Sequence, residues 1–593
     1  MPLPPDSRMN AVAERLDAAP HLDAEALSQA LSVPLSFDDV LPWIRFDAEN
    51  YRRNLVARTG RWELRLMCWR PGQSTSMHPH GDAACAFRII RGSATETRLG
   101  DRDRVWTQGE VVREPTGPVV HQLANREVDA LVTLHAYSPP LPVDAPSSAR
   151  GHEVIVVGGG FAGAAAVFHL LARGGPTLRI TWIENGPWLG RGIAYGVESP
   201  LYRLNVPAGR MSVDPAAPED FAQYAGVADA PQTFCSRATY GQYVTQRLRD
   251  AVSRAPGKLR VLRGLVVEAD DAQVRLADGR VLRGEAVVLA TGLAPRIDAS
   301  SETRSLSVVD AWDEALLAGL PRAGHLLVLG AGLTALDVLA FLDARAFEGR
   351  VTVVSRRGLL PLPHMNPPRP ATPLTDAQVA ALPVDLRSLV RWVRAFVDAQ
   401  VAEGEPWQVA LDRLRPHLGT LWRRLSPKDR QRFVRRVRPY WDAARHRAPV
   451  ESLERVAQWR ASGRLRILAG TLATTEVTGS TGVDVVVRTR DGHHHADHYD
   501  ALVRCIGPAI EGSDLETPLV RSMLLRGVAQ RDPAGLGIVT DDLGRVVDGT
   551  GRPNQRLFVL GALQRAHGWE TTSVPEIAVA ARALAQALLP ARP

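Results

Sequence analysis

A glycine-rich turn between a predicted strand and a predicted helix constrains the fold of this chain more than any other feature. The segment HEVIVVGGGFAGAAAVFHLL places Gly158, Gly160 and Gly163 in a G-x-G-x-x-G pattern. The first glycine allows the turn, the second lets the backbone approach a pyrophosphate, and the third allows close packing of helix on sheet. Glu184 ends the next predicted strand, where a carboxylate binds ribose hydroxyls. The pattern predicts a βαβ unit that binds a dinucleotide.

A second unit of the same kind begins further along the chain, at HLLVLGAGLTALDVLAFLDA. Gly330 and Gly332 occupy its turn, and its second strand ends in Ser355, Arg356 and Arg357. An acidic residue at that strand end would favour NAD(H). A hydroxyl and two guanidiniums favour the 2′-phosphate of NADP(H) instead, with NAD(H) kept as the alternative. The two arginines could also simply face solvent.

The chain has 593 residues, which is too many for one hydrophobic core, so two or three domains are expected. The stretch SPPLPVDAPSSARG predicts a linker at 141–151. Before it, residues 45–137 contain short runs of β-formers separated by turns, which favour an all-β barrel or sandwich, preceded by helices. The expected ranges are 1–140 for the first domain and 152–593 for an α/β region, with the second βαβ unit at about 323–360 and a helical insert at about 375–460.

Arginine carries nearly all of the positive charge. The net charge is +7, and Lys258 and Lys428 are the only lysines. The densest run, Arg423 to Arg447, contains nine arginines. A solvated helix face, or the wall of a pocket for an anionic cofactor or substrate, is a better interpretation of this run than a nucleic-acid surface.

Several other classes of protein are disfavoured by the sequence. There is no run of about 18 uncharged apolar residues that would predict a membrane span. The N-terminus has acidic residues where a signal peptide needs an apolar stretch, so the expected location is the cytoplasm. The four cysteines form no CxxC pair, which disfavours a disulfide framework, a structural zinc site and a dithiol reductase. They are Cys68, Cys85, Cys235 and Cys505.

Three histidines form a candidate metal site in the N-terminal region. His78 and His80 are an HxH pair, and residues i and i+2 of a strand share one face. His121 follows after a predicted turn. Three neutral imidazoles would leave open positions on a redox metal such as Fe(II), where substrate and dioxygen could bind. An HxH pair alone is a weak pattern, because surface and core histidines also produce it.

The surroundings of these histidines resemble cysteine dioxygenase. The resemblance runs through YRRNLV, CWRPGQSTSMHPHGDAAC, RGSATET and VTLHAYSPP, in the right order over about 90 residues. It implies a cupin barrel in which His78, His80 and His121 bind Fe(II). It also implies that Arg53, with Tyr51 beside it, binds the carboxylate of a thiol substrate. A guanidinium suits that role because it forms a bidentate pair with a carboxylate and stays charged when partly buried.

The same resemblance implies further catalytic residues. Cys85 stands where the family has a cysteine that forms a thioether with the active-site tyrosine, here Tyr137. A Ser-His-Tyr relay of the family corresponds to Thr133, His135 and Tyr137, with the hydroxyl kept. A small buried thiol remains the simpler interpretation of Cys85. Glu96 has no role in the resemblance, and we expect it on a strand, facing solvent.

The region after the linker resembles a poorly characterised bacterial family of FAD/NAD(P)-binding proteins within the two-dinucleotide flavoprotein class. The resemblance rests on VVLATG, YRLNVPAGRMS, WDAARHRAP and LFVLGALQRAHGWETTSVPEI, across roughly residues 152–590. It implies Rossmann-like domains in which the first unit binds FAD and the second binds the nicotinamide. VVLATG ends at Gly292 in a second FAD motif, and the Gly561-Ala562 step is expected near the flavin.

The sequence therefore predicts a multidomain enzyme that joins a cupin thiol dioxygenase to a FAD- and NADPH-dependent oxidoreductase or monooxygenase. Its partners would be a small thiol and O2, with L-cysteine first and mercaptosuccinate, 3-mercaptopropionate and homocysteine open. The flavin part could oxygenate the sulfinate product, or it could supply electrons that keep the iron ferrous. A third alternative is a flavin oxidoreductase whose cupin domain is a thiol or iron sensor.

Overall fold

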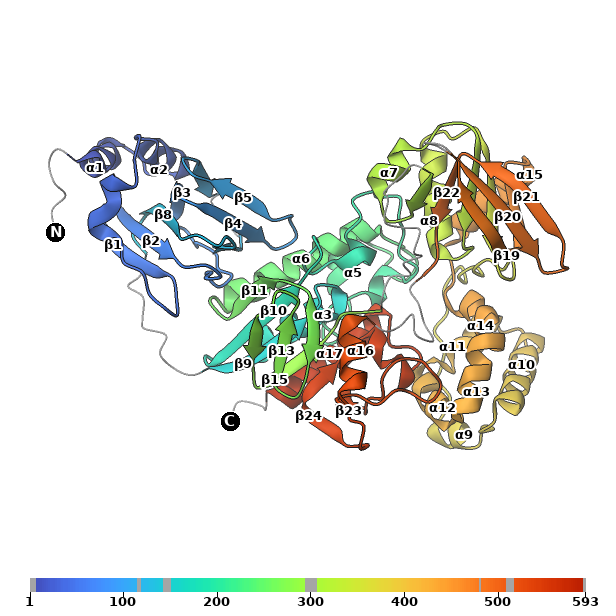
Figure 1. Cartoon of the computed structure of the whole chain (residues 1–593). Helices are drawn as coiled ribbons and strands as arrows, with labels where there is room; N and C mark the ends of the chain where they lie inside the picture. Colours follow the sequence, from blue (N-terminus) through green and yellow to red (C-terminus); the bar gives the residue numbers. More distant parts are fainter. Residues whose placement is uncertain are drawn as a thin grey trace.

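The computed structural model describes residues 7–114, 119–141, 151–293, 307–478, 482–507 and 517–589. Figure 1 shows an antiparallel region in blue, a central α/β region that includes the C-terminal strands and helices, and a third region in yellow-green to orange. The chain is thus multidomain. The linker expected at 141–151 lies outside the described residues except for its two ends. Within the described ranges, no helix combines the length and apolar character needed to cross a membrane.

The N-terminal region consists of two short helices followed by two antiparallel sheets. The sheets have strand orders β1-β2-β8-β3-β6 and β5-β4-β7. The side chains of Ser7 and Asp23 cap the helices by accepting hydrogen bonds from backbone N–H groups. The bounds are α1 (Arg8–Ala18), α2 (Ala24–Leu31), β1 (Arg52–Arg58), β2 (Glu63–Trp69), β3 (Ala84–Arg91), β4 (Ser93–Arg98), β5 (Arg104–Thr107), β6 (Val111–Glu114), β7 (His121–Ala124) and β8 (Leu131–Ser138).

Strand β8 is the centre of the larger sheet, and its first seven residues are all buried. Because side chains alternate between faces, its even-numbered positions, such as Leu134, pack against the core beneath α1 and α2. Its odd-numbered positions point to the opposite face. Tyr137 packs there with Trp69 and Phe87. The alternation therefore aims Thr133, His135 and Tyr137 away from the helices.

The central region is built on a six-stranded sheet with the order β11-β10-β9-β15-β24-β23, parallel except for β23. Strand β9 ends in a run of β-branched residues that are buried against helices on one face and mainly against a small antiparallel sheet on the other, because a parallel sheet is covered on both faces. A small antiparallel sheet, β12-β13-β14, lies beside it in sequence. The bounds are β9 (His152–Val157), β10 (Leu178–Glu184), β11 (Leu259–Arg263), β12 (Val266–Ala269), β13 (Gln273–Leu276), β14 (Val281–Arg283), β15 (Ala286–Leu289), β23 (Arg545–Val547) and β24 (Pro553–Val559).

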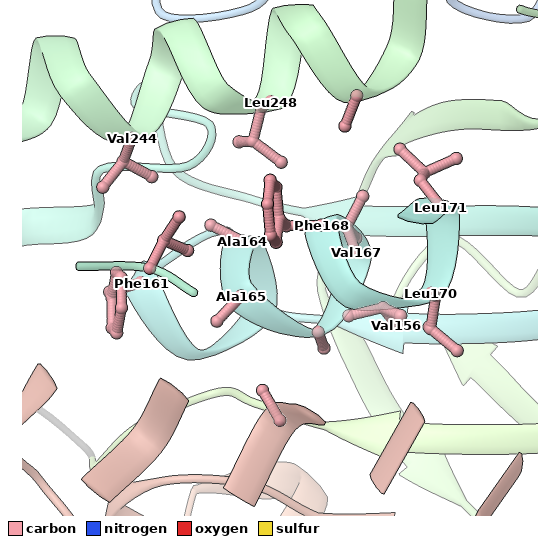
Figure 2. Close-up of a cluster of buried hydrophobic side chains, with 14 of the residues drawn as sticks. Val156, Phe161, Ala164, Ala165, Val167, Phe168, Leu170, Leu171, Val244 and Leu248 are labelled. Carbon is pink, nitrogen blue, oxygen red and sulfur yellow. The ribbon is translucent and has the colours of Figure 1, made fainter. Parts of the chain in front are cut away.

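Helix α3 (Phe161–Arg173) lies between α6 (Arg237–Arg254) and α17 (Val574–Leu588) and is buried along most of its length. Figure 2 shows Val244 and Leu248 of α6 above the alanine-rich turns of α3, while α17 passes below α3. Small side chains such as Ala164 and Ala165 let the neighbouring helices approach closely. The helix begins at Gly160, where no side chain caps it. Its first N–H groups are therefore left for another partner.

The third region has a seven-stranded sheet with the order β16-β22-β17-β18-β19-β20-β21. A helical insert lies between β18 and β19 in the sequence. Helix α8 starts at Gly332, again without a side-chain cap. The sheet and its helices are β16 (Val308–Asp310), α7 (Glu314–Gly319), β17 (His325–Leu329), α8 (Leu333–Ala344), β18 (Arg350–Ser355), β19 (Leu465–Val477), β20 (Val483–Thr489), β21 (His494–Tyr499) and β22 (Ala501–Arg504). The insert holds α9 (Asp376–Ala380), α10 (Leu386–Ala402), α11 (Trp407–Asp412), α12 (Leu418–Arg424), α13 (Pro427–Arg432), α14 (Arg438–Arg445) and α15 (Val450–Ala461).

The N-terminal region contacts the central region along edge strand β11. The side chain of Gln122 both donates to the carbonyl of Val261 (2.7 Å) and accepts from its N–H (2.8 Å). Met77 donates to the carbonyl of Leu259 at 2.6 Å. Asp103 forms ion pairs with Arg126 of its own region and Arg263 of β11. These bonds satisfy the open backbone groups that an edge strand would otherwise expose.

Candidate functional sites

Three histidines converge in the N-terminal region. The ring nitrogens of His78, His80 and His121 lie within 4.8 Å of one another, and the closest pair, Nε2 of His80 and Nε2 of His121, is 2.9 Å apart. His121 begins β7. His78 lies on an extended segment whose backbone exchanges two hydrogen bonds with His121 in an isolated bridge. The expected HxH pair is thus held by this bridge and not by a regular strand.

The outer nitrogens of two of these rings have fixed partners. Nδ1 of His78 donates to the carbonyl of Ser76 (2.8 Å), and Nδ1 of His121 donates to Glu96 (2.9 Å). Each bond leaves Nε2 unprotonated and aimed at the other rings. Burial, followed by the neighbouring His121, lowers the pKa of His78 to about 3. Neutral imidazoles with converging lone pairs are what a divalent transition metal requires, so the residues fit an iron site.

Glu96 is buried, and the expectation that it faces solvent was wrong. Its side chain is fully buried and bonds His121, Arg98 (2.6 Å) and the indole of Trp106 (3.1 Å). Although burial alone would raise it, the hydrogen bonds from His121 and Arg98 hold the pKa of Glu96 at about 2. An ionised carboxylate behind a metal-facing imidazole orients the ring and makes it a stronger ligand. Alternation along β4 could not reveal this, because the larger sheet covers the face of β4 that carries Ala94 and Glu96, and the opposite face is buried as well.

The predicted relay residues form a hydrogen-bonded row on β8. Nε1 of Trp69 donates to the hydroxyl of Thr133 (3.1 Å), and that hydroxyl lies 2.8 Å from Nε2 of His135. Nδ1 of His135 lies 3.3 Å from the Tyr137 hydroxyl. Since the indole can only donate, the threonine proton is directed to His135, which then donates from Nδ1 to Tyr137. The hydroxyl proton of Tyr137 is not used in this row, so it can be donated to another acceptor. The contribution of Trp69 was not predicted.

Tyr137 also connects the row to Cys85 and to the histidines. Cys85 and Tyr137 are directly opposed on β3 and β8, with the thiol in hydrogen-bonding range of the tyrosine. The ring of Tyr137 lies 5.6 Å from that of His80. Burial raises the pKa of the Cys85 thiol and of the Tyr137 phenol, so both carry their protons. Nearest cross-strand neighbours are close enough for their side chains to be bonded covalently.

Arg53 extends from β1 beside the histidine cluster. Its Nε donates to the hydroxyl of Tyr51 at 2.9 Å, and Tyr51 stacks on Trp69 with ring centroids 4.3 Å apart. The positive charge of Arg53 is among the causes that lower the pKa of His78, His80 and His135. The guanidinium is therefore within electrostatic range of all three rings. Stacking and the hydrogen bond to Tyr51 restrict its position.

The first glycine loop has the geometry expected of a dinucleotide site. A Cβ at Gly158 or at Gly163 would collide with backbone carbonyls, and Gly158 also has a φ of +111°. A Cβ at Gly160 would meet no atom within 4 Å, so its outer face is open to an approaching ligand. The carboxylate of Glu184 accepts hydrogen bonds from the backbone of Gly159 and Gly186. The Glu184 side chain therefore contacts the first glycine loop, the loop with which it shares the dinucleotide-binding sequence pattern.

The second glycine loop repeats this arrangement. Gly330 has a φ of +109° beside the backbone of Cys505, and a Cβ at Gly332 would meet no atom within 4 Å. Ser355 ends β18. Arg356 is exposed, whereas Arg357 donates to the carbonyl of Arg435 at 3.2 Å and lies over the ring of Tyr440.

The two remaining predicted glycines lie at strand ends of the central sheet. Gly292 follows β15 with a φ of +68°, and a Cβ there would meet nothing within 4 Å. Gly561 follows β24 with a φ of +85°, and its Cβ position lies 3.2 Å from that of Ala162. Ala162 is in the first turn of α3, so the segment after Gly561 passes beside the first glycine loop.

Two family models match this chain. Residues 29–146 match cysteine dioxygenase type I, and residues 155–294 match a family described as FAD-NAD(P)-binding. Cysteine dioxygenase type 1 of Danio rerio is 30% identical over 119 residues, which are 17% of this chain and 58% of that protein. The Homo sapiens protein of the same name is 30% identical over 111 residues, 16% of this chain and 56% of that protein. The chain spans a little over half the length of these relatives.

Solved structures resemble the remaining, larger part. The FAD-bound DfoA of Erwinia amylovora, a cadaverine monooxygenase of desferrioxamine biosynthesis, is 14% identical. The alignment covers 74% of this chain and 96% of DfoA, with a TM-score of 0.50. This likeness shows the fold of the larger part. The chain therefore joins a region that matches cysteine dioxygenase type I to a region that matches FAD-NAD(P)-binding proteins.

Proposed function

We propose that the N-terminal region is a cupin-type, Fe(II)-dependent thiol dioxygenase for a small carboxylate-bearing thiol, with L-cysteine as the first candidate. The observation that carries this proposal is the convergence of His78, His80 and His121, with Arg53 within electrostatic range. A bound Fe(II) would supply positions for the substrate thiolate and for dioxygen. Both oxygen atoms of O2 pass to the sulfur and give the sulfinate, so this reaction needs no external electrons.

The residues around the cluster have distinct tasks. Arg53 binds the substrate carboxylate, because its guanidinium presents paired N–H donors and Tyr51 restricts it. Thr133 and His135 orient Tyr137, whose own proton is then free to donate to a substrate or oxygen atom beside His80. Glu96 keeps His121 in the tautomer that presents Nε2.

Cys85 and Tyr137 are the residues of a thioether crosslink in this proposal. The thiol would lose its hydrogen, and the ring carbon ortho to the phenol hydroxyl would lose another. The two protons and two electrons released would pass to dioxygen, giving hydrogen peroxide. Their opposed positions on neighbouring strands support the bond. Mass spectrometry of the intact chain should detect a loss of about two hydrogens, absent from Cys85→Ala.

The larger region would bind FAD at the first glycine loop and NADP(H) at the second. The open faces of Gly160 and Gly332 support two sites, and the arginines after β18 favour the 2′-phosphate. NADPH would reduce FAD by hydride transfer. In the second half-reaction, one oxygen atom of O2 would convert the sulfinate to a sulfonate, and the other would leave as water. The alternative is that the electrons keep the iron ferrous.

The test is anaerobic purification of the whole chain with iron and flavin quantified. Oxygen uptake is then measured over a panel of thiols, with and without NADPH, and products are identified by mass spectrometry. We expect about one iron per chain and sulfinate formation from cysteine without NADPH. Iron-loaded protein that binds cysteine but consumes no oxygen would instead indicate a sensor domain.

Arg53→Ala provides the sharpest test of the substrate class. Loss of a charge-assisted pair costs about 1.5–3 kcal/mol, which corresponds to about 10–150-fold in kcat/KM for cysteine. Iron content should not change, and cysteamine, which has no carboxylate, should be used equally well by both proteins. An equal loss with cysteine and cysteamine would contradict the assigned role.

A further inference from the structure

Four arginines from distant parts of the chain gather between the helical insert and the segment that follows Gly561. We call them the arginine cluster: Arg210, Arg415 and Arg445, whose charges act on one another, and Arg565, which is linked to Arg445 through Glu570. Arg415 pairs with Glu576 at 2.9 Å, and Arg445 pairs with Glu570 at 3.2 Å. With four guanidiniums and two carboxylates, the cluster has an excess of two positive charges. The neighbouring pairs Arg447–Asp412 and Arg438–Asp442 are each neutral.

The cluster has buried hydrogen-bonding atoms without partners. Nε of Arg445 and both Nε and Nη1 of Arg565 are buried and bond nothing. The hydroxyls of Thr571 and Ser573 and Oε2 of Glu576 are also buried and without a hydrogen-bond partner. Native proteins satisfy nearly all such groups, so several together call for a missing partner. Five of these six atoms can donate, and one can only accept.

Ser573 adds an independent observation. It is the N-cap residue of α17, a position where a serine hydroxyl usually accepts a hydrogen bond from the helix backbone. Here it makes no capping bond. The hydroxyl therefore remains available at the N-terminus of this 15-residue helix, whose first turn includes Pro575, a residue without an N–H group. A helix N-terminus favours negative charge, and the guanidiniums beside it have the same preference.

The surroundings of two of these guanidiniums disfavour their positive charge. Arg210 is accessible to solvent, yet desolvation by the surrounding protein, with Arg415 next in effect, lowers its pKa to about 10. Burial, followed by the charge of Arg438, lowers the pKa of Arg565 to about 10. A bound anion would offset this cost.

The cluster also lies next to the first glycine loop. The insert is fastened to the segment after Gly561 by Trp422, whose indole donates to the carbonyl of Ala566 at 3.0 Å. Gly561 itself contacts Ala162 at the start of α3. The nine arginines of the 423–447 run thus divide. Arg445 belongs to the arginine cluster and its side chain is largely buried, whereas others, such as Arg432, are largely exposed.

We propose that the arginine cluster is the substrate site of the flavin region and that it binds a small amino acid carrying a second oxyanion, such as an amino-acid sulfinate. The carboxylate and sulfinate oxygens would accept from the guanidiniums and the two hydroxyls. The ammonium would donate to Oε2 of Glu576. The choice of a sulfinate rests on the proposed dioxygenase function, because that reaction supplies this ligand within the same chain. A diamine would meet two uncompensated positive charges.

The test is a titration of the oxidised, FAD-loaded full chain with cysteine sulfinate, followed by the flavin absorbance spectrum. Arg565→Gln is the main variant, because the Nε and Nη1 atoms of Arg565 have no partners to lose. Arg432→Gln is the matched control on the exposed side of the insert. We expect Arg565→Gln to weaken sulfinate binding at least about tenfold, with unchanged FAD content, and the control to bind as the unmodified chain does.

Three results would overturn the proposal: equal sulfinate affinity in Arg565→Gln and the unmodified chain, tighter binding of cadaverine than of the sulfinate, or loss of FAD from Arg565→Gln. The last would assign the cluster to the cofactor. The proposed function is judged separately, from oxygen uptake with cysteine. If cysteine is oxidised but no sulfinate binds, only the cluster assignment fails. If sulfinate binds and cysteine is not oxidised, the site stands and its ligand comes from another reaction.

Discussion

The histidine cluster and the arginine cluster are both sets of nitrogen-bearing side chains, but they are assembled in different ways. His78 and His80 lie on one extended segment that is bridged to His121 at the start of β7, and the outer nitrogens of His78 and His121 have fixed hydrogen-bond partners. The arginines come from positions as far apart as Arg210 and Arg565, and several of their N–H groups have no partner. The three imidazoles already converge, with ring nitrogens within 4.8 Å of one another. The arginine cluster has donors in excess of the acceptors around them.

This difference agrees with the roles proposed for the two sites. A metal site must be rigid before the ion arrives, because ligand geometry selects the metal. A substrate site must leave bonds unmade until the substrate arrives, because those bonds provide the binding energy. We therefore expect substitutions in the N-terminal region to change metal content. Substitutions in the larger region should change cofactor or substrate binding and leave the iron unaffected.

The largest effect is expected for His80→Ala. Removal of one of three imidazoles should reduce iron to background and abolish sulfinate formation, since two remaining ligands bind a divalent metal far more weakly. Iron per chain and oxygen uptake with cysteine measure this. FAD content should stay the same. His498→Ala, on exposed strand β21, is the control and should keep its iron. Loss of flavin together with iron would break the proposed independence of the two regions.

Glu96→Gln should produce a smaller change of the same kind. The amide can still accept from His121, but the negative charge that also binds Arg98 is lost. Replacing a residue that hydrogen-bonds to a metal ligand lowers metal affinity about 10–100-fold. Iron affinity is measured by competition with a chelator. Glu110→Gln, which removes an exposed carboxylate of the same region, serves as the control. An affinity equal to that of the unmodified chain would show that His121 needs no orienting carboxylate.

The two glycine loops provide a matched pair of substitutions. Gly160→Ala and Gly332→Ala each add a Cβ that meets no protein atom, and neither glycine has a positive φ. We expect Gly160→Ala to lower FAD content at least about tenfold, because the methyl group occupies the path of the pyrophosphate. Gly332→Ala should keep its FAD and raise the KM for NADPH. The reverse pattern would exchange the two cofactor assignments.

Whether a feature could be predicted from the sequence depended on how far apart in the sequence its residues lie. The glycine loops and the residues around the histidines are local patterns, in which a few consecutive residues determine a turn or a strand face. The solvent-facing prediction for Glu96 was wrong because a second sheet covers that side of β4, and alternation within one strand carries no information about what packs on it. The arginine run predicted a pocket wall only as one alternative. Which of its members turn inward depends on how the insert packs against residues more than 100 positions later.

The contact between the regions should show the smallest effect. Gln122 is buried and makes both hydrogen bonds to the backbone of Val261, so Gln122→Leu leaves an N–H and a carbonyl of β11 without partners. Each unsatisfied group costs about 1–3 kcal/mol. We expect calorimetry to show the N-terminal region unfolding several degrees earlier, as a separate transition, with iron and FAD content retained. Gln108→Leu, at an exposed turn of the same region, should unfold as the unmodified chain does. If Gln122→Leu also slows sulfinate-dependent NADPH oxidation while both isolated half-reactions keep their rates, the edge of β11 does more than fasten the regions together. It then keeps the histidine cluster, where the sulfinate forms, near the arginine cluster, where the sulfinate binds. The two clusters would in that case catalyse successive steps of one reaction sequence.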